Sequence, residues 1–271
     1  MNSTTVPMKI ATWNINSIRI REALLARFVA EHAPDVLCLQ ETKVEDQHFP
    51  HDLVARLGFA HVLFTGEKSY NGVAILSKLP LKLHATFDMI GNGHKRHIAA
   101  ELPGGILLHN FYVPAGGDIP DPAVNQKFDE KLRFIAAMRD WSQQEVKPGH
   151  KVIAVGDFNI APLEHDVWSH KQLLKIVSHT PVEVDGLNDV LRKSGGWVDA
   201  MRALVPHDQK LYSWWSYRNR DWEKSDRGRR LDHIWLTPAL KSSLSSGAII
   251  RAARGFENPS DHVPVVVGLG S

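Results

Sequence analysis

The sequence has a single cysteine, hardly any net charge and no long hydrophobic run, and each shortage excludes a class of protein. One cysteine, Cys38, cannot form an internal disulfide and suits a reducing compartment, so we expect a cytoplasmic location. The 32 basic and 30 acidic residues leave a formal charge of +2, unlike that of a non-specific polycation. No apolar run approaches the roughly 20 residues that span a bilayer, so we expect no membrane partner.

The chain also lacks signs of internal division. No Pro/Gly/Ser-rich linker, low-complexity tract or repeat interrupts its 271 residues, and a 43% share of apolar residues supplies ample core. Residues 1–7 lack the basic and apolar regions of a signal peptide, and we expect them to form a short flexible tail. We therefore predict one domain over residues 8–271, and we expect it to be a monomer.

Helical and strand patterns alternate at the start of the chain and predict a layered α/β fold. Residues 9–14 and 35–41 have the composition of buried strands, and residues 21–31 and about 49–57 have helical patterns. Further strands are predicted over residues 61–64, 72–76, 82–89, 98–102, 106–113, 151–159, 230–236, 248–251 and 261–267, and further helices over about 123–144, 163–177 and 187–193. Because short turns such as Gly104-Gly105 favour hairpins, we predict two mixed β-sheets with helices outside.

The stretch Lys151-Val-Ile-Ala-Val-Gly-Asp-Phe-Asn159 ends an apolar run abruptly in polar residues. A buried strand tolerates a polar residue only if that residue is paired or bound to something. Side chains two positions apart on a strand point to the same side, so Asp157 and Asn159 can converge beyond its end. Taken alone, the pattern fits equally well a turn in which Asp and Asn cap backbone groups.

Polar residues end other apolar runs in the same way. In open α/β sheets ligands bind in the crevice beyond the strand ends. Glu41 and Asp261 offer hard oxygen ligands, which suit Mg²⁺ or Mn²⁺, whereas the chain has no His-x-x-x-His or cysteine cluster for zinc. The residues at these edges are Asn14, Glu41, Asp157 with Asn159, Asp232, and Asp261 with His262.

Asp232 and His262 suggest a second catalytic unit. A carboxylate that accepts from one imidazole nitrogen fixes the tautomer and raises the basicity of the other, so His262 can donate to a phosphate or orient a water. A Ser-His-Asp hydrolase is the rival interpretation, but the chain has no Gly-x-Ser-x-Gly elbow. It also has no P-loop and no Gly-x-Gly-x-x-Gly between a strand and a helix, which disfavours nucleotide-dependent chemistry.

Spaced motifs with these residues resemble those of the endonuclease/exonuclease/phosphatase superfamily. They are Trp13-Asn14, Leu39-Gln-Glu-Thr42, Gly156-Asp-Phe-Asn159 and Ser260-Asp-His-Val-Pro264. The sequence is most similar to the exonuclease III branch, the apurinic/apyrimidinic endonucleases, through Gln40-Glu-Thr-Lys43, Tyr70-Asn-Gly-Val73, Tyr112-Val-Pro114, Tyr212-Ser-Trp-Trp-Ser-Tyr217 and Arg229-Arg-Leu-Asp232. Any one motif is weak, but together they run from Lys9 to Gly268 in the expected order.

The resemblance implies a fold and a set of roles. The fold is a four-layered α/β sandwich of two mixed β-sheets flanked by helices, as in deoxyribonuclease I. Glu41 is implied to be the main Mg²⁺ ligand, and the metal cluster to include Asn14, Asp157, Asn159, Asp261 and His262. Asp157 is implied to activate or orient the attacking water, and Asn159 to hold that water or the phosphate. Tyr112 is implied to contact the phosphate or leaving group, and Asp232 to orient His262.

Basic and aromatic residues near the end of the chain favour a nucleic acid substrate. Residues 218–230 contain six basic and three acidic residues, a local charge of +3, next to four aromatic residues, Trp214, Trp215, Tyr217 and Trp222. The plain alternative is a solvated loop beside a tryptophan-rich core. The resemblance implies that Trp214 packs on an abasic sugar, and it leaves Trp215 for the core. Predicted DNA contacts are Trp214, Arg218, Arg229, Lys68, Tyr70, Asn71 and Lys95.

Three positions depart from well-known relatives. Ala115 stands where others carry an amide, Asn16 where some are acidic, and Arg229 where some have a bulky apolar residue. The implied activity is Mg²⁺-dependent cleavage 5′ to abasic sites in duplex DNA, with Mn²⁺ as a substitute. Activity at 3′ ends, as a 3′→5′ exonuclease or in end-cleaning, accompanies it. The alternatives are another phosphodiesterase or phosphatase of the superfamily, or a catalytically inactive DNA-binding module.

Overall fold

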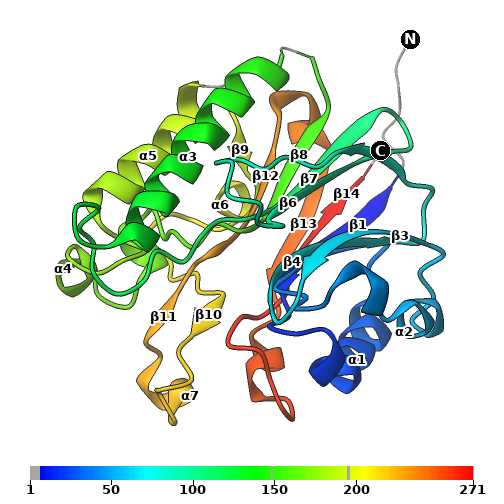
Figure 1. Cartoon of the computed structure of the whole chain (residues 1–271), viewed down its shortest axis with the longest axis horizontal. Helices are drawn as coiled ribbons and strands as arrows, with labels where there is room; N and C mark the ends of the chain where they lie inside the picture. The colour runs from blue at the N-terminus through cyan, green and yellow to red at the C-terminus, as the bar shows by residue number, and fades with distance from the viewer. Residues whose placement is uncertain (1–6, 148, 194–195, 271) are drawn as a thin grey trace.

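Two six-stranded β-sheets lie face to face in the computed structural model, and helices cover their outer sides (Figure 1). The structure describes residues 7–147, 149–193 and 196–270. The tail predicted over residues 1–7 lies, apart from Pro7, outside the described residues. No helix in the described ranges is both long and apolar enough to cross a membrane.

Both sheets are mixed, as predicted. The first has the order β13 (Leu244–Ile249), β14 (Val265–Leu269), β1 (Met8–Asn14), β2 (Val36–Gln40), β4 (Tyr70–Ser77), β3 (His61–Glu67). The second has the order β5 (Lys82–Ala85), β6 (His97–Leu102), β7 (Ile106–Tyr112), β8 (Val152–Asp157), β12 (Asp232–Leu236), β9 (Val198–Asp199). The pairs β1–β2 and β7–β8 are parallel and the other pairs antiparallel. A short ribbon of β10 (Trp214–Trp215) and β11 (Gly228–Arg229) projects from the body.

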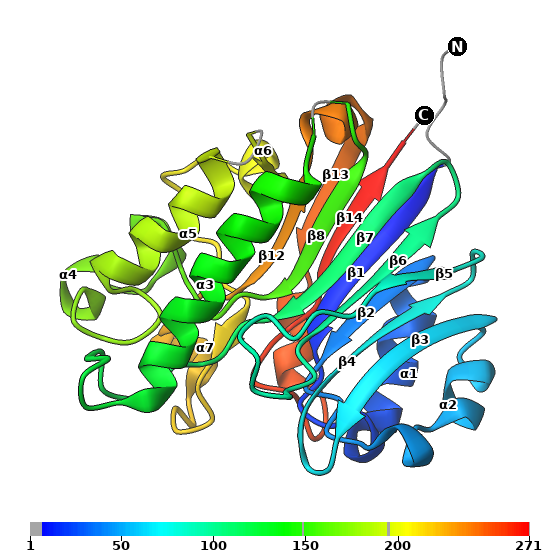
Figure 2. The same cartoon turned by 45° about the horizontal axis from the view of Figure 1, so that its top comes forward.

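The longest helices lie on the two outer faces (Figures 1 and 2). The α-helices are α1 (Glu22–His32), α2 (His51–Arg56), α3 (Gln126–Glu145), α4 (His170–Leu173), α5 (Pro181–Lys193), α6 (Ala200–Leu204) and α7 (Trp222–Ser225). Short 3₁₀ helices cover Arg19–Arg21, Asp46–His48, Glu164–Asp166, Pro238–Ser243 and Arg251–Gly255. Helices α1 and α2 pack on the first sheet, while α3 and α5 pack on the second. The predicted four-layered sandwich is therefore confirmed.

The main core lies between the sheets, where the alternating side chains of both inner faces meet. Ile10 and Cys38 of the first sheet pack with Leu108, Val155 and Ile234 of the second, all fully buried. Two outer cores attach the helices, one around Phe28 of α1 and one around Phe134 of α3. Because the sheets are joined through this apolar interior, polar side chains at their ends are held in fixed positions.

Several predicted boundaries were wrong for local reasons. Residues 163–177 do not form one helix, because Asp166 turns inward onto buried arginines and Val167 forms a β-bridge with Arg229. The strand predicted over 82–89 ends at Ala85. The last strand begins at Val265 rather than 261, because Val263 N–H donates to Ser213 outside the sheet and Pro264 has no N–H. Residues 261 and 262 therefore lie in a loop.

Candidate active site

The ends of β1, β2 and β8 meet at one edge of the two sheets. Asn14 is the last residue of β1, Glu41 follows β2, and Asp157 is the last residue of β8. The Asn14 Nδ2 group donates to Glu41 Oε1 at 2.9 Å and to Asp157 Oδ2 at 3.0 Å. A single buried amide thus joins carboxylates that the two sheets supply. The structure brings these three predicted residues together.

Glu41 is held as a carboxylate at this edge. It adopts a left-handed backbone with a φ of 52°, which turns its side chain away from the strand direction. Burial by itself raises the pKa of Glu41, but the neighbouring Lys43 and hydrogen bonds from Asn14, Lys43 and Tyr112 outweigh it and lower the pKa. The Tyr112 hydroxyl donates to Glu41 Oε1 at 2.6 Å. Burial and the Glu41 charge raise the pKa of Tyr112 well above its usual value, so it remains a donor.

Asp157 and Asn159 converge through a turn rather than through strand alternation. Asn159 has a left-handed φ of 53°, so the extended pattern stops at Asp157. The Asn159 backbone N–H donates to Asp157 Oδ1 at 2.9 Å, and its Nδ2 donates to Asp157 Oδ2 at 3.1 Å. Asp157 therefore caps the turn and also faces the site. Gly156 precedes it because a Cβ there would lie 1.8 Å from the backbone oxygen of Phe111.

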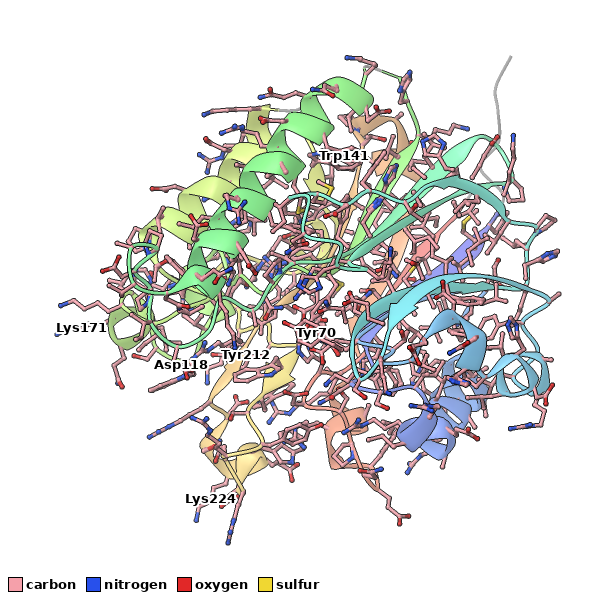
Figure 3. All side chains as sticks on the ribbon, viewed as in Figure 1. Tyr70, Asp118, Trp141, Lys171, Tyr212 and Lys224 are labelled. Carbon is pink, nitrogen blue, oxygen red and sulfur yellow. The ribbon has the colours of Figure 1, made fainter. Side chains whose placement is uncertain are left out.

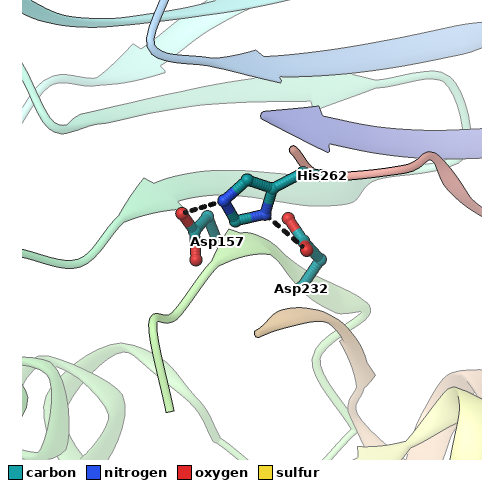
Figure 4. Close-up of side chains that lie close together, drawn as sticks. All are labelled: Asp157, Asp232 and His262. Atoms are coloured by element: carbon teal, nitrogen blue, oxygen red, sulfur yellow. Dashed lines mark hydrogen bonds and ion pairs between the residues drawn. The ribbon is translucent and has the colours of Figure 1, made fainter. Parts of the chain in front are cut away.

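His262 lies between two buried carboxylates (Figure 4). Its Nδ1 is 2.8 Å from Asp232 Oδ2, and its Nε2 is 3.6 Å from Asp157 Oδ2. Ser213 fixes Asp232 by donating its hydroxyl to the same oxygen at 2.6 Å. Burial lowers the pKa of His262, but Asp232 and Asp157 outweigh it and raise the pKa to about 10. The two carboxylates thus favour the protonated ring of His262, while burial raises the pKa of Asp157 above its usual value.

Asp261 lies at the rim of the site and is connected to Glu41 through Asn16 and Lys43. Its Oδ2 accepts from Trp214 Nε1 at 2.9 Å, and its Oδ1 accepts from Asn16 Nδ2 at 3.3 Å. Lys43 Nζ then connects Asn16 Oδ1 to Glu41 Oε2, each at 2.7 Å. Asn16, which stands where some relatives are acidic, thus places a neutral amide between Asp261 and Glu41.

The donor set fits a hard divalent cation. Glu41 and Asp157 supply carboxylate oxygens, which Mg²⁺ prefers, and the Lys43 ammonium beside Glu41 shows that this carboxylate attracts a cation. Asp157, Asp232 and His262 have ligand atoms within 4.8 Å of one another. Of the two ring nitrogens of His262, Nδ1 contacts Asp232, and Nε2 is the one that faces Asp157. Asn14 Oδ1 accepts from the Asn16 backbone N–H at 3.1 Å, so its oxygen is turned away from Glu41.

A cavity of about 710 Å³ opens from these groups toward the β10–β11 ribbon. Trp214 forms part of its wall and is half-buried, whereas Trp215 is fully buried in the outer core, as predicted. Arg218 lies at the exposed rim and Arg229 lines the cavity itself. The catalytic and DNA-binding groups predicted around Trp214 therefore share one cavity.

The basic segment presents less charge to this cavity than the sequence suggests. Arg230 is fully buried and forms ion pairs with Asp166 at 2.8 Å and Asp199 at 2.6 Å. The local charge of +3 predicted for residues 218–230 includes Arg230, so the interpretation of that whole charge as available to nucleic acid is wrong. The arginines that line the cavity in the described part of the chain are Arg218, Arg227 and Arg229.

The other predicted DNA contacts lie outside the cavity lining, around the β3–β4 turn. Lys68, Tyr70 and Lys95 are exposed there, whereas Asn71 is only 1% exposed. Asn71 Nδ2 donates to Glu67, which also accepts from the Lys95 backbone N–H, so the structure does not bring Asn71 to the surface with the others. In the view of Figure 3, Tyr70 lies near the centre, well above Lys224 at the tip of the ribbon.

Sequence reasoning missed Lys131, a buried residue of α3. Its Nζ donates to the backbone oxygens of Asn159 at 2.8 Å and Ala115 at 3.3 Å. The same ammonium forms an ion pair with Glu183 at 2.5 Å, and both side chains are 0% exposed. Lys131 thus holds the backbone beneath the site. A lysine in an amphipathic helix is usually solvated, so the sequence contains no signal for this role.

Residues 11–262 match the sequence model of the Endonuclease/Exonuclease/phosphatase family. The chain belongs to this family. Among curated relatives of this family member, the exodeoxyribonuclease III of Haemophilus influenzae is 30% identical, over 95% of this chain and 98% of the relative. The family predicted from the motifs is thereby confirmed.

Solved structures place this family member in the same branch. An AP endonuclease from Archaeoglobus fulgidus superposes with a TM-score of 0.89 at 33% identity, covering 97% of this chain and 99% of the other. A 3′ phosphatase from Neisseria, bound to a product DNA hairpin, superposes with a TM-score of 0.88 at 31% identity, covering 97% and 100%. The exonuclease III/AP endonuclease assignment and the deoxyribonuclease I-like fold are therefore both confirmed.

Proposed function

We propose that this protein is a DNA repair phosphodiesterase that cleaves duplex DNA 5′ to abasic sites and also acts at 3′ ends. Its kinship with exodeoxyribonuclease III and AP endonucleases makes it a nuclease hydrolase. The observation that carries the finer proposal is the joining of Glu41 and Asp157 by Asn14, beside the His262 ring, at the edge of a cavity walled by Trp214. We also propose that it works as a monomer in the cytoplasm.

Mg²⁺, or Mn²⁺ in its place, is the proposed cofactor. Glu41 and Asp157 would hold it, with Asp261 at the rim. When bound, the cation would polarise a phosphoryl oxygen and offset the charge that develops on the phosphate. Acidic groups that cluster at a site for a polyanion repel it without such a cation, which supports the requirement.

The side chains can divide the hydrolysis of one phosphodiester between them. Asp157 accepts the proton of a water that attacks phosphorus in line, and the bond from phosphorus to the 3′-oxygen breaks, leaving a 3′-hydroxyl. His262 donates from Nε2 to a phosphoryl oxygen, and Asp232 keeps the ring oriented through Nδ1. Asn159 stabilises the developing charge beside Asp157, and Tyr112 donates to the phosphate or leaving oxygen.

The cavity wall supports a duplex with one base missing as the substrate. Half-buried Trp214 offers an aromatic face to a sugar, while Arg218 at the rim and exposed Lys68 and Lys95 can meet backbone phosphates. A small soluble phosphate would leave this basic and aromatic rim without a partner. A DNA substrate uses both the rim and the acidic edge.

An activity panel tests this proposal. Purified protein is given a duplex with one abasic site, poly(A) RNA and inositol phosphates, each with Mg²⁺ and with EDTA. We expect cleavage of the abasic duplex in Mg²⁺ alone, leaving a 3′-hydroxyl. Preferred turnover of the RNA or of inositol phosphates would assign another activity of the superfamily, and binding without cleavage in Mg²⁺ or Mn²⁺ would reveal an inactive DNA-binding module.

The metal site has a test that does not depend on turnover. Isothermal titration with Mg²⁺ should show binding to the wild-type protein and at least about tenfold weaker binding to Glu41→Gln, because one charged oxygen ligand becomes a neutral amide. Asp129→Asn, on the exposed face of α3, is the matched control and should bind as wild type.

A further inference from the structure

A fixed arginine lies in the cavity beside the catalytic edge. Arg229 stands opposite Trp214 in the β10–β11 ribbon, with its guanidinium 5.3 Å from the centroid of the indole ring. Its Nη1 donates to the backbone oxygen of Val177 at 2.9 Å and to Ser178 Oγ at 2.7 Å. The stacking and the two hydrogen bonds hold the charged plane in one orientation.

The loop that anchors Arg229 is itself rigidly held. Ser178 has a left-handed φ of 87°, and its N–H donates to both oxygens of Glu183 at 2.9 and 3.0 Å. Glu183 also accepts from the N–H and hydroxyl of Thr180, and Lys131 neutralises it. The buried ion pair therefore supports the loop from below, and the groups that accept hydrogen bonds from Arg229 belong to a well-held segment.

The charge of Arg229 has no acidic partner of its own. No ion pair joins it to an acid in the described part of the chain, and its Nε is buried without a hydrogen-bond partner there. Glu183 is the acid whose charge acts on it, but that charge already faces Lys131 at 2.5 Å. A cation that is partly desolvated and uncompensated favours an anion from the ligand.

The position of Arg229 determines which part of a substrate meets it. In the proposed reaction the phosphorus lies at the acidic edge and loses its 3′-oxygen, so its other substituent extends into the cavity toward Trp214 and Arg229. At an abasic site that substituent is a neutral sugar. At a damaged 3′ end it can be a short arm that carries a carboxylate.

We infer that Arg229 is a specificity-determining residue, which favours 3′ ends whose terminal phosphate carries a short anionic arm over the neutral sugar of an abasic site. The inference rests on the proposed function. The probe is a 3′-phosphoglycolate end, whose carboxylate lies a few bonds beyond phosphorus and can accept from Nη2, the guanidinium nitrogen that the two anchoring hydrogen bonds do not use. Water attacks phosphorus, the bond to the 3′-oxygen breaks, that oxygen takes a proton, and phosphoglycolate leaves, so no oxidant or reductant is needed.

Kinetics on three substrates test the role of Arg229. Arg229→Gln keeps a hydrogen-bond donor but loses the charge, Arg229→Lys keeps the charge, and Arg133→Gln on the exposed face of α3 is the matched control. Each protein is given 3′-phosphoglycolate, 3′-phosphate and abasic duplexes in Mg²⁺, and its thermal unfolding is checked. We expect Arg229→Gln to lose about 10- to 100-fold in kcat/KM on 3′-phosphoglycolate, which is the value of one charged hydrogen bond.

The pattern across substrates decides the outcome. Arg229→Gln should lose at least about tenfold less kcat/KM on the abasic duplex than on 3′-phosphoglycolate, the lysine variant should keep most of the activity, and Arg133→Gln should behave as wild type. Equal losses on the abasic and phosphoglycolate substrates, or an unchanged ratio between them, would overturn the inference. An equal loss on 3′-phosphate would show that Arg229 contacts the phosphate itself. That result would also contradict the proposed contact with the carboxylate of the arm.

A binding assay separates this inference from the proposed function. Fluorescence anisotropy in EDTA compares hairpins with 3′-phosphoglycolate and 3′-hydroxyl ends on Asp157→Asn protein, with and without Arg229→Gln. We expect the Asp157→Asn protein to bind the phosphoglycolate hairpin more tightly than the hydroxyl hairpin. The double variant, which also carries Arg229→Gln, should lose that preference. If the wild-type enzyme cleaves none of the substrates, the proposed function fails, while equal binding of the two hairpins refutes the inference even if cleavage is normal.

Discussion

The buried pair of Lys131 and Glu183 yields the sharpest prediction about stability. Lys131→Met keeps the length of the side chain and removes its charge, which leaves Glu183 without a counter-ion at 0% exposure. Removing one partner of a buried pair costs about 3–5 kcal/mol. Glu183 keeps its hydrogen bonds from Ser178 and Thr180, so we expect a loss near 3 kcal/mol.

The same substitution also affects the site. Lys131 also holds the Asn159 backbone, so the variant should lose activity as well as stability.

Urea denaturation at pH 7 measures the free energy of unfolding, and thermal melts should show a decrease in Tm of roughly 6–12 °C at pH 7. Lys131→Met with Glu183→Gln should be more stable than Lys131→Met alone, because the amide keeps an acceptor without a charge. A loss below about 1 kcal/mol at pH 7, or a double variant no better than the single one, would refute the reasoning.

Further predictions concern catalysis, backbone space and acid stability. Asp157→Asn should lower kcat on the abasic duplex by about 10²–10⁴ with the fold intact by circular dichroism, and near-wild-type turnover would remove Asp157 from its role. Gly156→Ala should destabilise the fold by on the order of 3 kcal/mol in urea melts, because the new Cβ meets the Phe111 backbone. Burial lowers the pKa of His97 to about 3 and that of His109 well below its usual value. As the pH falls, these histidines bind protons in the unfolded state before they do so in the folded state. The free energy of unfolding should therefore fall as the pH drops below 6.5, by about 4 kcal/mol for the pair at pH 5. A urea midpoint that stays constant between pH 7 and pH 5 would contradict this.

The architecture was predictable because its signals are local. The alternation of apolar strands and amphipathic helices before residue 60 predicts the layered start, and the hairpin at Gly104-Gly105 predicts antiparallel pairing. Polar residues at the ends of apolar runs, such as Asn14, Glu41 and Asp157, predicted the edge where the site lies. Each of these signals depends on a few neighbouring residues.

Other features depend on contacts between distant segments, which a single sequence does not contain. Asp157 and Asn159 meet through a left-handed turn. The prediction that their side chains converge was therefore correct, but its reason, strand alternation, was wrong. Arg230 follows directly after Arg229, yet one is sealed in ion pairs with Asp166 and Asp199 while the other lines the cavity. Only the packing of remote acids distinguishes them.

The order of the first sheet ties the His262 side chain to the pairing of two distant segments. Strand β14 lies between β13 and β1, so residues 265–269 pair with residues 8–12. His262 lies just before β14, and its Nδ1 contacts Asp232 of the second sheet. A change that loosens the pairing of β1 with β14 would therefore also loosen the contact between His262 and Asp232.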